Sequence, residues 1–448
     1  MTDTPHHSRK FLGAVTKKLI LLQVLFLGLF AYIFGSLFQQ DAHTHNLQIA
    51  FVDYDGGAIG AAVRQAYSSM QGDTFPTLVE RPASEYTAPA TLQSAVCNID
   101  YWAAIYVLPG ASERLHDALV DNATIYNRHN ALAFIWNEAR YSTVVGPAIA
   151  SNIAALSAAA RIAYSTANGT GQLQSLLSHA PPTPDALSIL SNPWELSATN
   201  IQPTKQGSRA IYNTIAIILV IIQDFFFLSM LNALHQNFKV YTTHKAHPAR
   251  IIAVRTLFSL TYCMIGSFCV TGSIWAFRSG WDVDGNQFAL TWVTLWLFGH
   301  INFQTLDVFT VWLPHPYVLM GLISWIIFNV TSTILPFELS PAFYRVGYMF
   351  PAHETYQVLI DIWSRGCNPQ LRHALPVLLV WEVVVSVISA VGVFKRIRGA
   401  VAGEEEGKKS FDERVEAAMR LREKAESEEM VEGAGYTLGS GEFGAAAV

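Results

Sequence analysis

An uncharged apolar run, Leu19–Phe38, is the feature that most limits how this chain can fold. As a helix rising about 1.5 Å per residue, it is long enough to cross the roughly 30 Å hydrocarbon core of a bilayer. Asp41 follows the run, and four basic residues precede it, an asymmetry that keeps the N-terminus in the cytoplasm. The sequence therefore predicts a transmembrane helix over 19–38 behind a disordered cytoplasmic tail over 1–18. The basic residues are Arg9, Lys10, Lys17 and Lys18.

A cleaved signal peptide is the alternative interpretation of the same run. Signal peptides carry an apolar stretch of about 7–15 residues and a small-residue cleavage motif after it. Leu19–Phe38 is longer than that stretch and lacks the motif. We therefore favour a retained membrane anchor, which sends the residues after it across the membrane.

Composition places the whole chain in the membrane class. Of its 448 residues, 51% are hydrophobic and 14% are charged, against about 25% charged in soluble proteins. Mean hydropathy is +0.27. The net charge of −5 predicts no nucleic-acid partner, because such partners bind basic surfaces. The four cysteines form neither a disulfide scaffold nor a zinc motif.

Alternating strand-like and helical patterns predict a small external α/β domain over 45–205. Leu47–Asp53 and Tyr101–Leu108 are apolar runs typical of buried strands, and Ala123–Tyr126 is a candidate third strand. Ala58–Met70 and Ala111–Val120 have apolar residues at helical spacing.

The second half of this domain has a different composition. Ala131–Ala167 is rich in Ala, which predicts one or two helices with a break near Pro147. Asn168–Pro203 contains many Gly, Ser and Pro residues, which predicts a loop that returns the chain to the membrane.

Five further apolar segments predict a transmembrane domain over 210–398, because each is near the roughly 20 residues that a spanning helix needs. Basic residues in His235–Arg250 and after the last segment favour a cytoplasmic position for both. The predicted fold class is an α-helical membrane protein with six transmembrane helices, an external α/β domain between the first two, and both termini in the cytoplasm. The five segments are Ala210–Leu231, Ile251–Trp275, Phe288–Thr310, Tyr317–Leu335 and Ala374–Phe394.

Two segments outside the spans have patterns of their own. Ala352–Arg365 places Tyr356 and Trp363 on one helical face, which predicts a helix lying in the membrane interface. Residues 399–448 are predicted to form an acidic cytoplasmic tail, helical over Ser410–Met430 and partly disordered.

A set of short motifs resembles one family of membrane proteins. Asn329-Val330, Pro336-Phe-Glu-Leu-Ser-Pro341, Phe343-Tyr-Arg-Val-Gly-Tyr348 and Pro351 stand in this order, and Phe51-Val-Asp-Tyr-Asp-Gly-Gly57 follows the first span. Together they resemble the fungal nitrosoguanidine-resistance membrane proteins, a family of largely unknown function. That family looks related to bacterial phage-infection proteins and, more distantly, to membrane subunits of type-two ABC exporters.

The resemblance covers roughly Lys17 to Arg398 and implies one span, a large external domain and five further spans. It also implies resistance to toxic compounds and a plasma-membrane role in lipid or drug movement. It supplies no catalytic residues.

Polar side chains within the predicted spans are the main candidates for a site. A charge near the bilayer centre costs at least ~2.5–3.5 kcal/mol, so such groups usually face a partner or a water-filled path. An ion pair between Asp224 and Arg255 is one hypothesis, because both are expected near the cytoplasmic ends of neighbouring spans. We favour structural packing of these groups, and a transport path is the alternative. The candidate residues are Gln223, Asp224, Arg255, His300, Asn302, Gln304 and Asp307.

The predicted external portion carries two kinds of modification site. Asn122-Ala-Thr124 and Asn168-Gly-Thr170 match the N-glycosylation pattern, and Asn168 is the better acceptor because a flexible loop is expected there. Cys97 and Cys367 are both expected in an oxidising compartment. A disulfide between them is a hypothesis, since sequence leaves their distance open.

No motif for catalysis, metal binding or cofactor binding emerges. Gly56-Gly57-x-x-Gly60 lacks the G-x-G-x-x-G spacing and is expected to be a plain turn. The leading hypothesis is an exporter-like or lipid-handling membrane protein, not an enzyme, whose partners are the bilayer and a lipid or small toxic compound. The alternative is a non-transporting scaffold that binds proteins through its external domain and tail. A homo-oligomer is compatible with either hypothesis.

Overall fold

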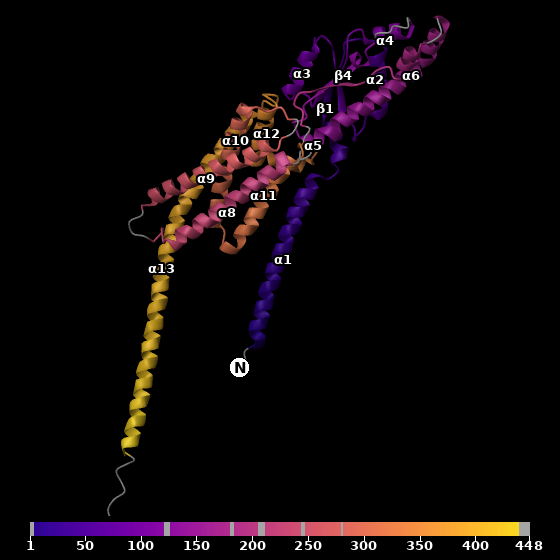
Figure 1. Ribbon diagram of the computed structural model, residues 1–448. Helices are drawn as coiled ribbons and strands as arrows, with labels where there is room; N and C mark the ends of the chain where they lie inside the picture. The colour runs from indigo at the N-terminus through magenta and orange to yellow at the C-terminus, as the bar shows by residue number, and fades with distance from the viewer. Residues whose placement is uncertain are drawn as a thin grey trace, which may run out of the picture.

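The computed structural model describes residues 4–120, 126–179, 183–204, 211–242, 247–278 and 281–438. The fold is mostly helical, with a helix bundle and an α/β domain at one end of it (Figure 1). Two long helices, α1 (Thr4–Ser36) and α13 (Leu371–Leu438), extend away from that domain (Figure 1). We call the two ends of the bundle the domain side and the tail side.

The α/β domain contains a mixed five-stranded sheet with the strand order β2-β1-β3-β4-β5. β3 and β4 are antiparallel, and the other neighbouring strands are parallel. The strands are β1 (Gln48–Asp53), β2 (Thr77–Arg81), β3 (Ala103–Val107), β4 (Leu132–Trp136) and β5 (Ser197–Asn200).

Helices cover both faces of this sheet. Alternate residues of β1 point to opposite faces, so Phe51 packs toward α2 and α6 while Val52 packs toward α3. Residues of α4 and α7 flank the first of these layers. The helices are α2 (Ala58–Met70), α3 (Pro89–Cys97), α4 (Ala111–Val120), α5 (Ser142–Val145), α6 (Ser151–His179) and α7 (Pro184–Ser191).

Several predicted elements of this domain differ from the structure. The stretch predicted as helical from Ala131 contains β4, a buried apolar strand too short to show a period of its own. A π-helical segment, Gly146–Ala150, joins α5 to α6 at the expected break. The predicted loop Asn168–Pro203 instead contains the end of α6, then α7 and β5. Of the candidate strand Ala123–Tyr126, residues 123–125 lie outside the described residues.

Six helical segments in the described part of the chain are long and apolar enough to cross a membrane. Five overlap the predicted spans, and the sixth is the α5–α6 segment, which packs against α2 in the α/β domain. The predicted span Phe288–Thr310 is not among the six, because α10 (Gly285–Trp312) carries several polar residues. The six segments are Leu12–Ser36, Ser142–Gln174, Asn213–Asn237, Pro248–Ala276, His315–Ile334 and Leu371–Ala425.

The bundle is built around α10, whose polar residues are turned inward. α10 packs against α8 (Ala216–Asn237), α9 (Pro248–Ala276), α11 (Val318–Ile334) and α13. A π-helical segment, Ile211–Ile215, leads into α8, and 3-10 helices over His315–Tyr317 and Ala342–Met349 flank α11. Large apolar side chains remain exposed on the outer surfaces of α1, α8, α9 and α13, as expected of helices that contact lipid.

Helix α12 (Pro351–Trp363) corrects the prediction of a helix lying in the membrane interface. It packs among α10, α11 and α13, and Tyr356 and Trp363 are both buried by protein. The apolar residues at helical spacing do share one face of α12, but the opposite face also carries buried residues such as His353 and Glu354. A period alone does not show whether the second face meets water or other helices.

Both ends of the chain contain more helix than predicted. α1 begins at Thr4, so the described part of the 1–18 tail is helical rather than disordered. α13 continues from the last predicted span into the acidic tail without a break, and residues 401–425 are all exposed. Both helices extend on the tail side (Figure 1).

Candidate functional site

One face of α10 supplies much of the polar network buried in the bundle. His300, Gln304 and Asp307 recur at i, i+4 and i+7, so they share a helix face. Every side chain from Phe298 to Asp307 is buried. A helix with this much buried polar surface needs partners on neighbouring helices, because unpaired polar groups are costly away from water.

Helix α13 carries the partners, which are not among the site residues predicted from sequence. Glu382, Ser389 and Arg396 recur at seven-residue intervals and therefore face α10 along one side of α13. Glu382 contacts His300, and the other two contact Asp307. One feature of the sequence could have identified them: Glu382 is a lone carboxylate in an otherwise apolar run, and Ser389 and Arg396 follow it at seven-residue intervals.

The tail-side part of the network joins two arginines to one carboxylate. Arg255 of α9 and Arg396 of α13 each place Nη2 at 2.7 and 2.6 Å, respectively, from Oδ1 of Asp307. The Ser389 hydroxyl donates to Oδ2 of Asp307 at 2.6 Å. The hypothesis that Arg255 pairs with Asp224 is therefore wrong. Arg255 binds Asp307 and, on α8, the side-chain oxygen of Asn232 at 3.0 Å, about two helical turns from Asp224.

The middle of the network centres on His300. Its Nδ1 lies 2.6 Å from Oε1 of Glu382, and its Nε2 lies 3.1 Å from both the Ser259 hydroxyl and the Gln304 amide nitrogen. All these groups come from three helices, α9, α10 and α13. A histidine between a carboxylate and a hydroxyl group is an arrangement that can pass a proton.

Asp224 lies apart from these pairs and is 1% exposed. Its Oδ1 accepts a weak hydrogen bond from the Cys263 thiol at 3.6 Å, and its Oδ2 has no hydrogen-bond partner in the described part of the chain. The preceding residue, Gln223, lies against Gly266 of α9, which leaves room for its amide because it has no side chain.

Asn302 serves a structural contact between two bundle helices. Its Oδ1 accepts a hydrogen bond from the Trp325 indole at 2.7 Å, and its Nδ2 donates to the backbone oxygen of Phe298. Both its polar groups are thereby satisfied within the core. We therefore separate Asn302 from the titratable groups around His300.

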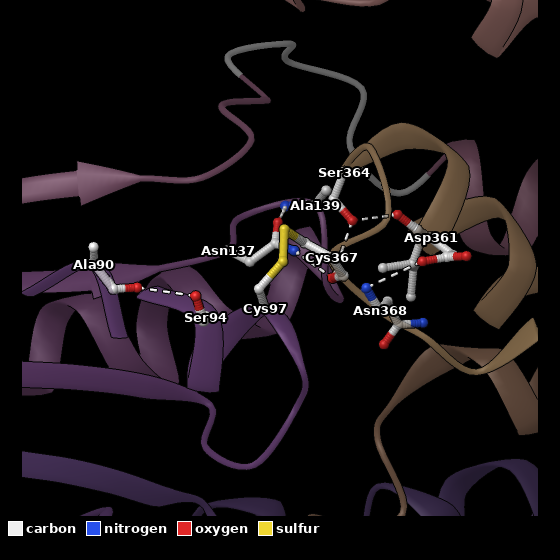
Figure 2. Close-up of a disulfide and its surroundings, with 10 residues drawn as sticks. Ala90, Ser94, Cys97, Asn137, Ala139, Asp361, Ser364, Cys367 and Asn368 are labelled. Carbon is white, nitrogen blue, oxygen red and sulfur yellow. Dashed lines mark hydrogen bonds between the residues drawn. A yellow bond between two sulfur atoms is a disulfide. The ribbon is translucent and has the colours of Figure 1, made fainter. Parts of the chain in front are cut away.

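The α/β domain is joined to the bundle by a disulfide between Cys97 and Cys367, with an S–S distance of 1.97 Å. Figure 2 shows Cys97 at the end of α3 meeting Cys367 in the turn after α12. The Asn137 amide donates to the backbone oxygen of Cys367 at 3.1 Å (Figure 2). The Ser364 hydroxyl donates to the same oxygen. These contacts fix the domain against the loop between α12 and α13.

A cavity of about 280 Å³ lies beside this junction, between the domain and the bundle. The Arg140 guanidinium stacks on the Trp102 ring, 3.6 Å from its centroid. Burial lowers the pKa of Arg140 to about 10, and the nearby charge of Glu338 partly opposes this shift. Glu354 and His353 also line the cavity. They belong to α12, which is not one of the spanning segments.

The buried Glu354 makes the stability of this junction depend on pH. Burial raises its pKa from 4.5 to about 7, so the folded protein holds a proton that the unfolded chain releases. The free energy of unfolding should therefore fall as pH rises from about 4.5 through 7. Glu354→Gln removes this titration. We expect its free energy of unfolding, relative to that of wild type, to rise by roughly 2–3 kcal/mol as the pH increases from 5 to 8.

Thermal unfolding midpoints in detergent, measured across this pH range, test the prediction. Burial lowers the pKa of the neighbouring His353 to about 4, so its contribution to stability changes with pH in the opposite direction. This contribution is the same in wild type and in the variant, so it cancels in the comparison. Glu113→Gln, at an exposed position on α4, is the matched control. A difference between Glu354→Gln and wild type that does not change with pH would contradict the assignment.

The two glycosylation sequons have different positions. Asn122 lies outside the described residues. Asn168 lies within α6, half-buried, and its amide donates to the backbone oxygen of Tyr164 at 3.3 Å. The flexible loop expected around Asn168 is therefore absent, and its glycosylation stays a prediction. No group of three or more metal-ligating side chains occurs within the described ranges.

These features define a multi-pass membrane protein with a mixed α/β domain attached to a helix bundle with a polar core. Residues 18–387 match the family described as a protein of unknown function, DUF3533. The chain belongs to this family, because the match covers most of its length.

A curated relative from Saccharomyces cerevisiae is an uncharacterised endoplasmic reticulum membrane protein, YJR015W. It is 20% identical over 378 residues, which cover 77% of this chain and 71% of the relative. No solved structure matches the chain.

Proposed function

We propose that this protein moves an amphiphilic compound, a lipid or a small toxic molecule, across its membrane and uses a proton as the coupling ion. The observation that carries the proposal is the group of titratable side chains inside the bundle around Asp224, His300 and Glu382. Nothing in the proposal requires enzymatic activity. The proposal includes a role in resistance to toxic compounds, which the motif resemblance implies.

Two carboxylates inside the bundle each have an oxygen without a hydrogen-bond partner among the described residues. These oxygens are Asp224 Oδ2 and Glu382 Oε2, and both are buried. Asp224 Oδ2 lies against Gly299 of α10, which precedes His300, the partner of Glu382, so both carboxylates lie beside the same part of α10. Glu382 has His300 as a partner, whereas Asp224 has no cationic partner among the described residues. A carboxylate like that of Asp224, in a medium of low dielectric constant, is stable when it holds a proton or a cation. Acidic and histidine side chains inside membrane bundles often form proton relays.

The proposal includes the sidedness expected from sequence. Disulfides persist in oxidising compartments, so the Cys97–Cys367 bond supports a lumenal or extracellular α/β domain and cytoplasmic tails. The motif resemblance favours the plasma membrane. The yeast relative is named as an endoplasmic reticulum membrane protein, and the oxidising lumen of that organelle suits the disulfide equally. We therefore propose the endoplasmic reticulum membrane as the location of this protein.

Flux of a labelled lipid or toxic amphiphile into vesicles that hold the purified protein tests the function. We expect a proton gradient across the vesicle membrane to raise the flux of wild type. The double variant Asp224→Asn, Glu382→Gln cannot titrate at these positions and should lose that gradient dependence. Asp282→Asn, in an exposed ion pair with Arg365, is the control and should behave as wild type. Gradient-independent flux in wild type, or full gradient dependence in the double variant, would contradict proton coupling.

A further inference from the structure

A second cavity, of about 480 Å³, lies on the tail side of the bundle between α8, α11 and α13. Its wall combines apolar and polar side chains. The apolar part includes Phe225, Ala233 and Leu319, and the polar end includes Asn232, Thr310 and Arg396.

The polar end of this cavity carries an unbalanced positive charge. Arg255 and Arg396 share the single carboxylate of Asp307, and both donate to the same oxygen. Within 4 Å, Asp307 is the one carboxylate that meets either guanidinium among the residues that the structure describes. Two guanidinium groups against one carboxylate leave one positive charge in excess, because arginine remains charged.

Arg396 also has an unmet donor. Its Nη2 binds Asp307 and the Thr310 hydroxyl at 2.6 and 2.7 Å, but its Nε is buried and has no hydrogen-bond partner within the described ranges. The side chain of Arg396 is 14% exposed and lines the cavity, whereas Arg255 is 6% exposed and does not. A buried donor on a surplus cation is costly unless an acceptor, and preferably an anion, reaches it.

We infer that this cavity binds the phosphate group of an anionic membrane lipid. Arginine suits phosphate because its planar donors match the phosphate oxygens. The apolar wall suits an acyl chain, and neighbouring side chains on the outside of α8, Phe226 and Met230, are 64% and 65% exposed. Inorganic phosphate shares the headgroup chemistry but gains nothing from an apolar wall. The inference concerns binding alone and holds with or without transport.

Two cations beside the cavity fit a lipid-facing position. Lys18 of α1 donates to the Tyr317 hydroxyl at 2.8 Å, next in sequence to lining residues of α11. Lys395 lies 4.3 Å from the centroid of the Trp312 ring, next to Arg396. Lysine and aromatic residues typically mark the headgroup level, where basic groups attract anionic lipids.

Native mass spectrometry of the full-length protein in detergent tests the inference with three probes. These are phosphatidic acid, phosphatidylcholine with the same acyl chains, and inorganic phosphate. Wild type should bind phosphatidic acid about tenfold more tightly than phosphatidylcholine, because one charged hydrogen-bonded contact distinguishes them. Inorganic phosphate that binds as tightly as phosphatidic acid would make a free anion the ligand and overturn the lipid assignment.

Arg396→Gln leaves Asp307 paired with Arg255 in a balanced ion pair, and should weaken phosphatidic acid binding about tenfold. Arg365→Gln, at an exposed ion pair elsewhere, is the matched control and should bind as wild type. Ala233→Phe fills the cavity without altering its charge and should also weaken binding. Unchanged phosphatidic acid binding in Arg396→Gln would overturn the inference. If that variant does not fold, unchanged binding in Ala233→Phe would do so.

Discussion

Replacing Asp307 by Asn is expected to lower the free energy of unfolding by about 3–5 kcal/mol, the usual effect of removing one partner from a buried ion pair. Asp307 is 1% exposed and is the shared partner of Arg255 and Arg396. Its loss would leave two buried guanidinium groups facing each other without a carboxylate. Thermal unfolding of the purified protein in detergent measures the effect.

Asp282→Asn is the matched control, because it removes the same chemical group from an ion pair at the surface. Asp282 and Arg365 are 83% and 54% exposed, so this pair contributes at most about 1 kcal/mol. An Asp307→Asn protein as stable as the Asp282→Asn protein would show that the carboxylate does not hold the tail-side end of the bundle together.

Replacing Cys97 by Ser should destabilise the attachment of the α/β domain by about 2–4 kcal/mol, the typical contribution of a disulfide. The bond joins residues 270 positions apart and so restricts a very long loop in the unfolded chain. Reductant should shift the unfolding midpoint of wild type toward that of Cys97→Ser and leave the variant unchanged. The midpoint is read from tryptophan fluorescence.

Cys269→Ser serves as its control, since Cys269 is a free, exposed cysteine of α9. It should unfold as wild type does, with and without reductant. A wild-type protein that reductant does not affect, together with a Cys97→Ser midpoint equal to that of Cys269→Ser, would exclude a stabilising disulfide.

Local apolar patterns predicted some elements with the bounds that the structure shows. α2 over Ala58–Met70 and α4 over Ala111–Val120 are examples, because each buries one stripe at helical spacing. β5 over Ser197–Asn200 could not be predicted in this way. It is a polar edge strand, and its pairing with β4 comes from the tertiary fold rather than from its own residues.

The polar residues of the bundle were identifiable from sequence, but their pairing was not. Asp224 and Arg255 occur on consecutive helices, which made them natural partners. The position of each side chain along the packed helices decides which groups meet. Arg255 lies level with Asn232 of α8 and Asp307 of α10, about two helical turns from Asp224. Glu382 escaped notice because a single carboxylate hardly alters a long apolar run.

The most direct test of the architecture asks whether the α/β domain and the α13 tail lie on opposite sides of the membrane. A membrane-impermeant maleimide would be applied to sealed microsomes whose cytosolic face is outward. The variants carry Glu113→Cys on α4 or Asp412→Cys on α13, both at exposed positions, in a Cys269→Ser background. We predict that Asp412→Cys is labelled at once and that Glu113→Cys is labelled only after detergent opens the membrane. Equal labelling of both variants in sealed microsomes would contradict the account.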